Sequence, residues 1–212
     1  MEVKKGIIFD MDGTLWDSAE GVAASWNEII EKEYTADRKL TAGDIQSVMG
    51  LTMKRLAAKL FPELEEKKRL ELVDHCGEYE NGYLRIHGGS LYDGLEATIG
   101  QLKEKYHLYI VSNCQSGYIE AFLEHYGFGK YFDDIECYGN NLLEKGENIR
   151  KVVDRNQLTH AVYVGDIQGD YDASRQAGVL FIHAAYGFGK IDAQVPKINK
   201  FTELPEIMKT IF

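Results

Sequence analysis

Short apolar runs recur along the chain and predict the strands of a sheet. They lie at Val3–Phe9, His107–Val111, Ala161–Val164 and Val179–His183, each bounded by charged or polar residues. Between the later runs, apolar positions recur at helical spacing, as in the segment Ile119–Tyr126. Strands that alternate with helices in this way are typical of a parallel sheet with helices on both faces. The pattern therefore predicts an α/β fold with a parallel-sheet core.

Residues 17–88 lack this alternation, and their pattern predicts helices only. One apolar helix face consists of Val22, Trp26, Ile29 and Ile30, and another of Leu72, Cys76, Tyr79 and Tyr83. Shorter helical pieces lie between these two, and Gly88–Gly89 is a candidate hinge back to the core. We predict an all-helical cap domain at residues 17–88, inserted into a core domain of residues 1–16 and 89–212.

The composition of the chain argues against some classes of partner and indicates a cellular compartment. The chain has 212 residues, of which 44% are hydrophobic, so it can bury a core and a smaller appended domain. Its formal net charge of −10 argues against nucleic acid, because a phosphate backbone requires a basic surface. No apolar run is long enough for a membrane span or a signal peptide, so we expect a cytoplasmic protein without a membrane partner. Cys76, Cys114 and Cys137 form no CxxC pair and predict free thiols. These features do not define an oligomeric state, and a monomer is compatible with them.

Two acids follow the first predicted strand directly. Asp10 and Asp12 stand one residue apart, and Gly13 then allows the chain to turn away. Ligands of parallel sheets bind at the carboxyl ends of the strands, so both acids would be delivered to such a site. For these residues taken alone, a polar turn after a strand is the alternative interpretation.

Polar residues also follow the later strands. Ser112 and Asn113 stand between a strand and a helix, where hydroxyl and backbone N–H groups suit a phosphate, although a helix cap has the same composition. Lys145 precedes another predicted helix, where a lone lysine is usually solvated. Asp166 follows a strand and Asp170 lies four residues beyond it. Carboxylates suit a hard cation, whereas acids at a helix start also complement the helix dipole.

Together, these residues resemble the four motifs of the haloacid dehalogenase superfamily. The motifs match Asp10–Thr14, Ser112–Asn113, Lys145 and Gly165–Asp170, so the resemblance extends over the whole chain. The helical insertion is similar to the cap that follows the first motif in phosphoglycolate phosphatases and β-phosphoglucomutases. The resemblance implies a Rossmann-like core in which the strand before Asp10 lies in the middle of the sheet.

The resemblance assigns a role to each acid. Asp10 is the implied nucleophile, which accepts a phosphoryl group as an aspartyl-phosphate. Asp12 is the implied acid that protonates the leaving oxygen and then takes a proton from the attacking water. Mg²⁺ is the implied cofactor, held by Asp10, the carbonyl of Asp12 and Asp166, with Asp170 in a ligating or supporting position.

The remaining motif residues are implied to bind phosphate. Ser112, the backbone N–H of Asn113 and Lys145 would hold the phosphoryl oxygens. Gly146 follows Lys145 where many relatives have proline, a departure from the family pattern. In the cap, Thr52 and Lys54 are candidates for contact with the leaving group, because the matching loop of relatives reaches the substrate.

The implied function is magnesium-dependent hydrolysis of a small phosphorylated metabolite, either phosphoglycolate-like or a sugar phosphate. A sugar phosphomutase of the β-phosphoglucomutase type is an alternative, but Val22 stands where those relatives have a histidine. A non-catalytic regulatory module that binds phospho-ligands is a second alternative, since receiver domains also combine acids, a hydroxyl, a lysine and magnesium. The loop Tyr186–Gly189 either borders the entrance of the site or lies on the surface.

Overall fold

A six-stranded parallel sheet forms the centre of the protein, for which the computed structural model describes residues 3–34 and 39–212. The strand order is β5-β4-β1-β6-β7-β8, and every neighbouring pair is parallel. The strands are β1 (Lys5–Phe9), β4 (His107–Ser112), β5 (Asp134–Cys137), β6 (His160–Gly165), β7 (Leu180–Ala184) and β8 (Lys197–Ile198). The predicted α/β core with the Asp10 strand inside the sheet is confirmed, because β1 lies between β4 and β6.

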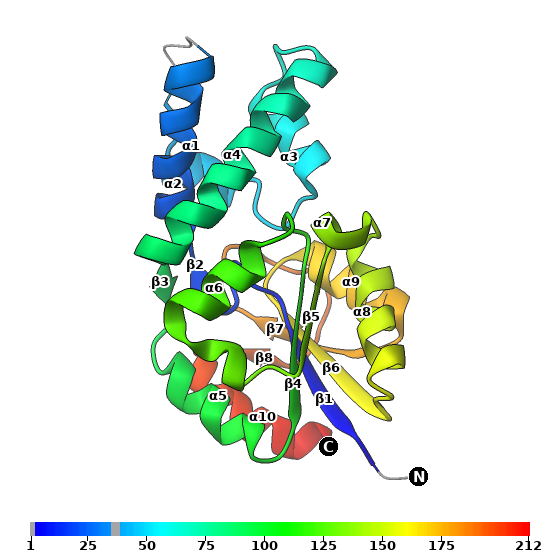
Figure 1. The fold of residues 1–212 in the computed structure, drawn as a ribbon. Coiled ribbons are helices and arrows are strands. Elements are labelled where there is room, and N and C mark those ends of the chain that lie inside the picture. The colour runs from blue at the N-terminus through cyan, green and yellow to red at the C-terminus, as the bar shows by residue number, and fades with distance from the viewer. Residues whose placement is uncertain (1–2, 35–38) are drawn as a thin grey trace.

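Alternate residues of β1 face two separate apolar layers. Ile7 and Phe9 pack in the layer that includes buried residues of α5 (Leu95–Lys103), α6 (Tyr118–Tyr126) and α10 (Leu204–Ile211). Ile8 packs in the layer that includes α8 (Lys145–Arg155) and α9 (Gln168–Ala177). Because successive side chains of a strand point to opposite faces, one run of apolar residues serves both layers. Figure 1 shows these two helical layers on either side of the sheet.

A group of helices stands over one end of the sheet (Figure 1). It consists of α1 (Ala19–Glu33), α2 (Ala42–Gln46), α3 (Met53–Leu60) and α4 (Glu66–His87). The chain enters this helical cap through β2 (Trp16–Asp17) and leaves it through β3 (Ser90–Leu91), and these two strands pair antiparallel. Gly88, in the predicted hinge, ends α4 with a φ of +67°, a conformation that glycine adopts without steric cost.

The predicted buried face of α4 was partly wrong. Leu72 and Cys76 are buried as expected, but Tyr79 is 37% exposed, and Glu80 and Asn81 are buried in its place. Hydropathy favours tyrosine over glutamate on an apolar face. This turn of α4, however, contacts the loop between β4 and α6, whose polar groups form hydrogen bonds with Glu80 and Asn81.

Short elements complete the fold. They are α7 (Tyr138–Asn141) and two 3-10 helices at Phe128–Lys130 and Phe201–Glu203. The three cysteines are free, as predicted. No helix within residues 3–34 and 39–212 combines the length and the apolar composition that a membrane crossing requires.

Candidate active site

The first motif forms a tight turn at the carboxyl end of β1. Asp10 N–H donates to the carbonyl of Val164 at 2.9 Å, so the sheet pairing continues to the first acid. The chain then turns at Gly13, whose φ is +80°. A Cβ atom at Gly13 would lie 2.2 Å from Asp166 Oδ2, so a side chain there would collide with the neighbouring acid. The turn is therefore built to bring buried carboxylates from two strands together, which a solvated polar turn does not do.

Lys145 is buried at the centre of these acids. Its side chain is 4% exposed, and its Nζ donates to Asp10 Oδ1 at 2.9 Å and to Asp170 Oδ1 at 2.6 Å. Burial favours the neutral amine, but the charges of Asp10 and Asp170 outweigh it and raise the pKa of Lys145 above its ordinary value. The ammonium ion is thus fixed beside the expected nucleophile, and the solvated alternative does not apply to it.

Asp170 holds its neighbours in position. Its Oδ2 accepts the backbone N–H groups of Asp166 at 3.0 Å and of Ile167 at 3.2 Å, while its Oδ1 accepts Lys145. Asp166 Oδ2 accepts the N–H of Phe188 at 2.7 Å. Because both oxygens of Asp170 already have protein partners, its geometry suits the supporting position better than direct ligation.

The acids form a cluster whose donor set fits a divalent cation. One oxygen from each of Asp10, Asp166 and Asp170 lies within 4.8 Å of the others. Burial and then the charge of Asp170 raise the pKa of Asp10 to about 7, although Lys145 opposes this. Burial and the charges of Asp170 and Asp10 raise the pKa of Asp166 to about 8. Crowded carboxylates repel one another, and a hard cation with oxygen ligands such as Mg²⁺ offsets that repulsion.

Asp12 is held by two hydroxyl groups that the sequence did not reveal. Ser18 Oγ and Tyr118 Oη both donate to Asp12 Oδ1, at 2.7 and 2.6 Å. Burial raises the pKa of Asp12 to about 6, and these two hydrogen bonds oppose the rise. Tyr118 lies 106 positions away from Asp12, at the start of α6. In the sequence, only the position of Tyr118 after the strand that ends at Ser112 could have indicated that it lies near Asp12.

The predicted phosphate-binding residues lie beside Asp12. Ser112 is the last residue of β4, and it lines a cavity together with Asn113 and Asp12. Asn113 Nδ2 donates to the carbonyl of Gly50 at 2.8 Å, so the second motif also contacts the cap. The structure therefore places the predicted site residues in two groups that meet at the first motif, and their roles stay predictions. One group is Asp10, Lys145, Asp166 and Asp170, and the other is Asp12, Ser112 and Asn113.

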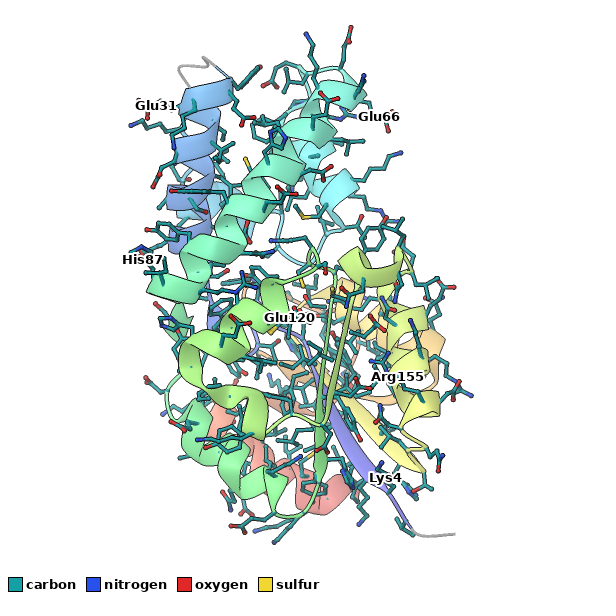
Figure 2. The ribbon with its side chains drawn as sticks, in the orientation of Figure 1. Lys4, Glu31, Glu66, His87, Glu120 and Arg155 are labelled. Atoms are coloured by element: carbon teal, nitrogen blue, oxygen red, sulfur yellow. The ribbon has the colours of Figure 1, made fainter. Side chains whose placement is uncertain are left out.

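The two cap candidates do not line this cavity. Thr52 is buried at the residue before α3, and Lys54 is 66% exposed and pairs with Glu66 at 2.8 Å. Figure 2 shows Glu66 at the outer end of the cap. The expected contact of Lys54 with a leaving group is thus corrected, because the lysine points to solvent and already has an acidic partner. The loop itself does reach the core, through Gly50.

The cavity lies between the cap and the core and encloses about 470 Å³, part of it open to solvent. Water-sized spheres can occupy only about 40 Å³ of it, so the space already open to a ligand is small. Apolar residues form most of its wall, and the polar residues are few. Its lining consists of Asp12, Val22, Trp26, Ile45, Val48, Met49, Gly50, Leu51, Met53, Leu56, Glu80, Ser112, Asn113, Cys114, Gln115 and Tyr118.

The loop after β7 packs directly on the first motif. Tyr186 Oη donates to the carbonyl of Thr14 at 2.7 Å, and the N–H of Phe188 donates to Asp166. A Cβ atom at Gly187 would lie 2.3 Å from the carbonyl of Gly13, so only glycine allows this approach. The sequence left open whether this loop borders the site or lies on the surface. These contacts with the first motif and with Asp166 place it at the site.

Comparisons with known proteins agree with this geometry. Residues 7–184 match the family described as haloacid dehalogenase-like hydrolase. The chain belongs to this family. It is 27% identical to a phosphoglycolate phosphatase of Rhodobacter capsulatus, over 96% of each chain. It is 26% identical to a 5'-nucleotidase of Pseudomonas aeruginosa, over 88% of this chain and 85% of the relative.

The fold is also shared with solved structures. A predicted phosphoglycolate phosphatase from Haemophilus somnus aligns with a TM-score of 0.82 at 20% identity, covering 98% of this chain and 99% of its own. A predicted phosphatase from Clostridium acetobutylicum aligns with a TM-score of 0.78 at 23% identity, covering 98% of this chain and all of its own. The fold of the chain is thus shared with these two structures over nearly its whole length.

Proposed function

We propose that this haloacid dehalogenase-like hydrolase is a magnesium-dependent phosphatase that hydrolyses a small phosphorylated metabolite through an aspartyl-phosphate on Asp10. The observation that supports this most is the salt bridge of Lys145 with Asp10 and Asp170, which joins three strand-end motifs in one buried cluster. Curated relatives over most of the chain are phosphatases that act on phosphoglycolate or on nucleotides by name.

Asp10 and Asp12 divide the reaction between them. A carboxylate oxygen of Asp10 attacks phosphorus, the bond to the leaving oxygen breaks, and Asp12 gives that oxygen its proton. Asp12 then takes a proton from water, which attacks the aspartyl-phosphate and releases inorganic phosphate and free Asp10. The hydroxyls of Ser18 and Tyr118 keep the carboxyl group of Asp12 in one orientation during both steps.

The remaining residues stabilise the transferred group. Lys145, Ser112 and the N–H of Asn113 would hold the phosphoryl oxygens, where negative charge is spread in the transition state. Asp10, the carbonyl of Asp12 and Asp166 would hold Mg²⁺, with Asp170 in support. The bound cation would supply charge neutralisation between the carboxylates and the anionic substrate.

The cavity favours hydrolysis over the phosphomutase alternative. Val22 lines it, at the position where β-phosphoglucomutase relatives have a histidine. No histidine lines the cavity in the described part of the chain. The proposed cap of residues 17–88 would exclude bulk water from this cavity, and the β2–β3 pair would connect it to the core of residues 1–16 and 89–212.

Phosphate release from p-nitrophenyl phosphate, with Mg²⁺ or with EDTA, tests the proposal. Asp10→Asn removes the attacking oxygen, so turnover should fall to background. Asp12→Asn should reduce kcat on an alkyl phosphate by roughly 10²–10⁴-fold, and by less on p-nitrophenyl phosphate, whose leaving group hardly needs a proton. Wild-type turnover that persists in EDTA, or normal turnover by folded Asp10→Asn, would reject the mechanism, whereas a folded wild type without turnover in Mg²⁺ would favour the regulatory alternative.

A further inference from the structure

The cavity beside Asp12 is where the alcohol part of a phosphomonoester must lie. Asp12 protonates the leaving oxygen, so the atoms attached to that oxygen extend into the space that Asp12 shares with the cap. This placement rests on the proposed phosphatase function. The chemistry of the cavity wall therefore selects among alcohols.

The wall offers no cation to a leaving group. Among the described residues, no lysine, arginine or histidine lines the cavity. Lys54 and Arg55, on the nearest cap helix, pair instead with Glu66 and Glu144 at the surface. Lys145 contacts the catalytic acids and belongs to the phosphoryl side. A carboxylate on the alcohol would thus lose its water without gaining an ionic partner.

A buried acid faces the cavity from α4. Glu80 is 3% exposed and lines the wall. Its Oε2 accepts the indole N–H of Trp26, and its Oε1 accepts Gln115 Nε2 at 3.0 Å. These neutral donors fix the carboxylate in place, and a carboxylate has about four acceptor positions, so it can accept further hydrogen bonds from a ligand.

The other polar atoms of the wall also present acceptors. Asn113 Nδ2 donates to the carbonyl of Gly50, which fixes the orientation of the amide. Its buried Oδ1 has no hydrogen-bond partner within the described residues. Gln115 Nε2 is already engaged with Glu80 and with Asn81 Oδ1 at 3.1 Å. The N–H groups of Gln115 and one N–H of Asn113 are therefore used within the protein, while Glu80 and Asn113 Oδ1 can accept further hydrogen bonds.

We propose that the substrate is a phosphomonoester of a small alcohol that carries hydroxyl or ammonium donors and no carboxylate, with Glu80 as the residue that selects it. Glu80 and Asn113 accept hydrogen bonds from the alcohol, and the apolar wall packs against its carbon atoms. This wall chemistry favours a sugar or polyol phosphate, or an amino-alcohol phosphate, over phosphoglycolate.

A size-matched substrate series tests the proposal on the wild-type protein. The series is 2-phosphoglycolate, 2-hydroxyethyl phosphate and O-phosphoethanolamine, which share a two-carbon alcohol that ends in a carboxylate, a hydroxyl or an ammonium group. At about pH 8 with Mg²⁺, kcat/KM for at least one of the last two should exceed that for phosphoglycolate by roughly 100-fold, the usual size of a like-charge penalty. The hydroxyl and ammonium arms distinguish a neutral alcohol from a cationic one.

Two variants assign the selection to the cavity wall. Glu80→Gln should reduce that preference, measured as the ratio of kcat/KM values within the series, at least tenfold. Met49→Lys, at a partly exposed position of the lining, should raise kcat/KM for phosphoglycolate relative to the other two esters. Glu78→Gln removes the same charge from the exposed face of α4 and serves as the matched control.

The outcomes of these assays distinguish a failure of the proposed substrate class from a failure of the proposed phosphatase function. Equal or better hydrolysis of phosphoglycolate by the wild type would overturn the proposed substrate class and leave the phosphatase function standing. An unchanged preference in folded Glu80→Gln and Met49→Lys would overturn the role of the wall. If neither p-nitrophenyl phosphate nor any ester of the series is hydrolysed, the phosphatase function fails and this proposal fails with it.

Discussion

Asp166→Asn removes one of the three buried carboxylates whose oxygens lie within 4.8 Å of one another. Burial and the charges of Asp170 and Asp10 raise the pKa of Asp166 to about 8 from its ordinary 3.8 in the metal-free protein. An acid with a higher pKa in the folded than in the unfolded chain binds more protons when folded. The free energy of unfolding therefore decreases as the pH rises from about 4 to about 8. We expect this variant to be more stable than the wild type at about pH 8 without metal.

The pKa difference sets the size of the effect. A rise from 3.8 to about 8, at about 1.4 kcal/mol per pKa unit, gives a ceiling of about 6 kcal/mol for Asp166. Asparagine recovers part of this, because its buried amide must also lose water. It keeps an oxygen for the N–H of Phe188. A gain of about 2 kcal/mol would raise the melting temperature of a chain of this length by about 4–8 °C.

Calorimetric melting at about pH 5.5 and about pH 8, with EDTA or with Mg²⁺, measures this gain. At about pH 8 in EDTA, Asp166→Asn should melt above the wild type, and the difference should shrink at about pH 5.5. Mg²⁺ should raise the melting temperature of the wild type but not that of the variant. Asp172→Asn, which changes an exposed acid of the same helix as Asp170, should behave as the wild type. A lower melting temperature for Asp166→Asn in EDTA at about pH 8 would refute the reasoning.

Two further predictions concern the neighbours of these acids. Gly13→Ala would place a Cβ 2.2 Å from Asp166 Oδ2, so magnesium-dependent phosphate release should fall by about 100-fold or more, whereas Gly129→Ala, where a Cβ meets nothing within 4 Å, should retain it. Tyr118→Phe removes a hydrogen bond that stabilises ionised Asp12, so the pKa of Asp12 should rise above about 6. Because the first step needs the protonated acid, the alkaline decline of kcat/KM for an alkyl phosphate should move to higher pH, and an unchanged profile would contradict this role of Tyr118.

The positions of the seven motif residues could be predicted because the topology of a parallel sheet brings the ends of its strands together. Asp10, Ser112 and Asp166 each stand at the carboxyl end of a short apolar run, and neighbouring parallel strands end at the same edge. The order of polar residues along the chain thus determines a cluster in space. No side-chain geometry was needed for that step.

The edge strand β5 could not be found in the same way. Asp134 and Glu136 interrupt its apolar residues, so no apolar run marks it. In the folded protein, Arg155 Nη1 donates to Glu136 at 2.7 Å, and its Nη2 donates to Asp134 at 2.8 Å. Figure 2 shows Arg155 on the helix beside this edge of the sheet. A strand stabilised by ion pairs with a later helix leaves no local hydropathy signal.

The absence of a hydropathy signal also explains why the buried face of α4 was predicted wrongly, and that error concerns a residue of the cavity wall. Hydropathy identifies residues that avoid water, and it therefore preferred Tyr79 to Glu80 on the buried face. Glu80 can be buried because Trp26 of α1 and Gln115 of the loop after β4 donate hydrogen bonds to it. Burial of this acid costs solvation free energy, and the buried carboxyl group lines the cavity beside Asp12. The departure of α4 from its apolar pattern therefore falls at Glu80, the residue that we propose selects the substrate.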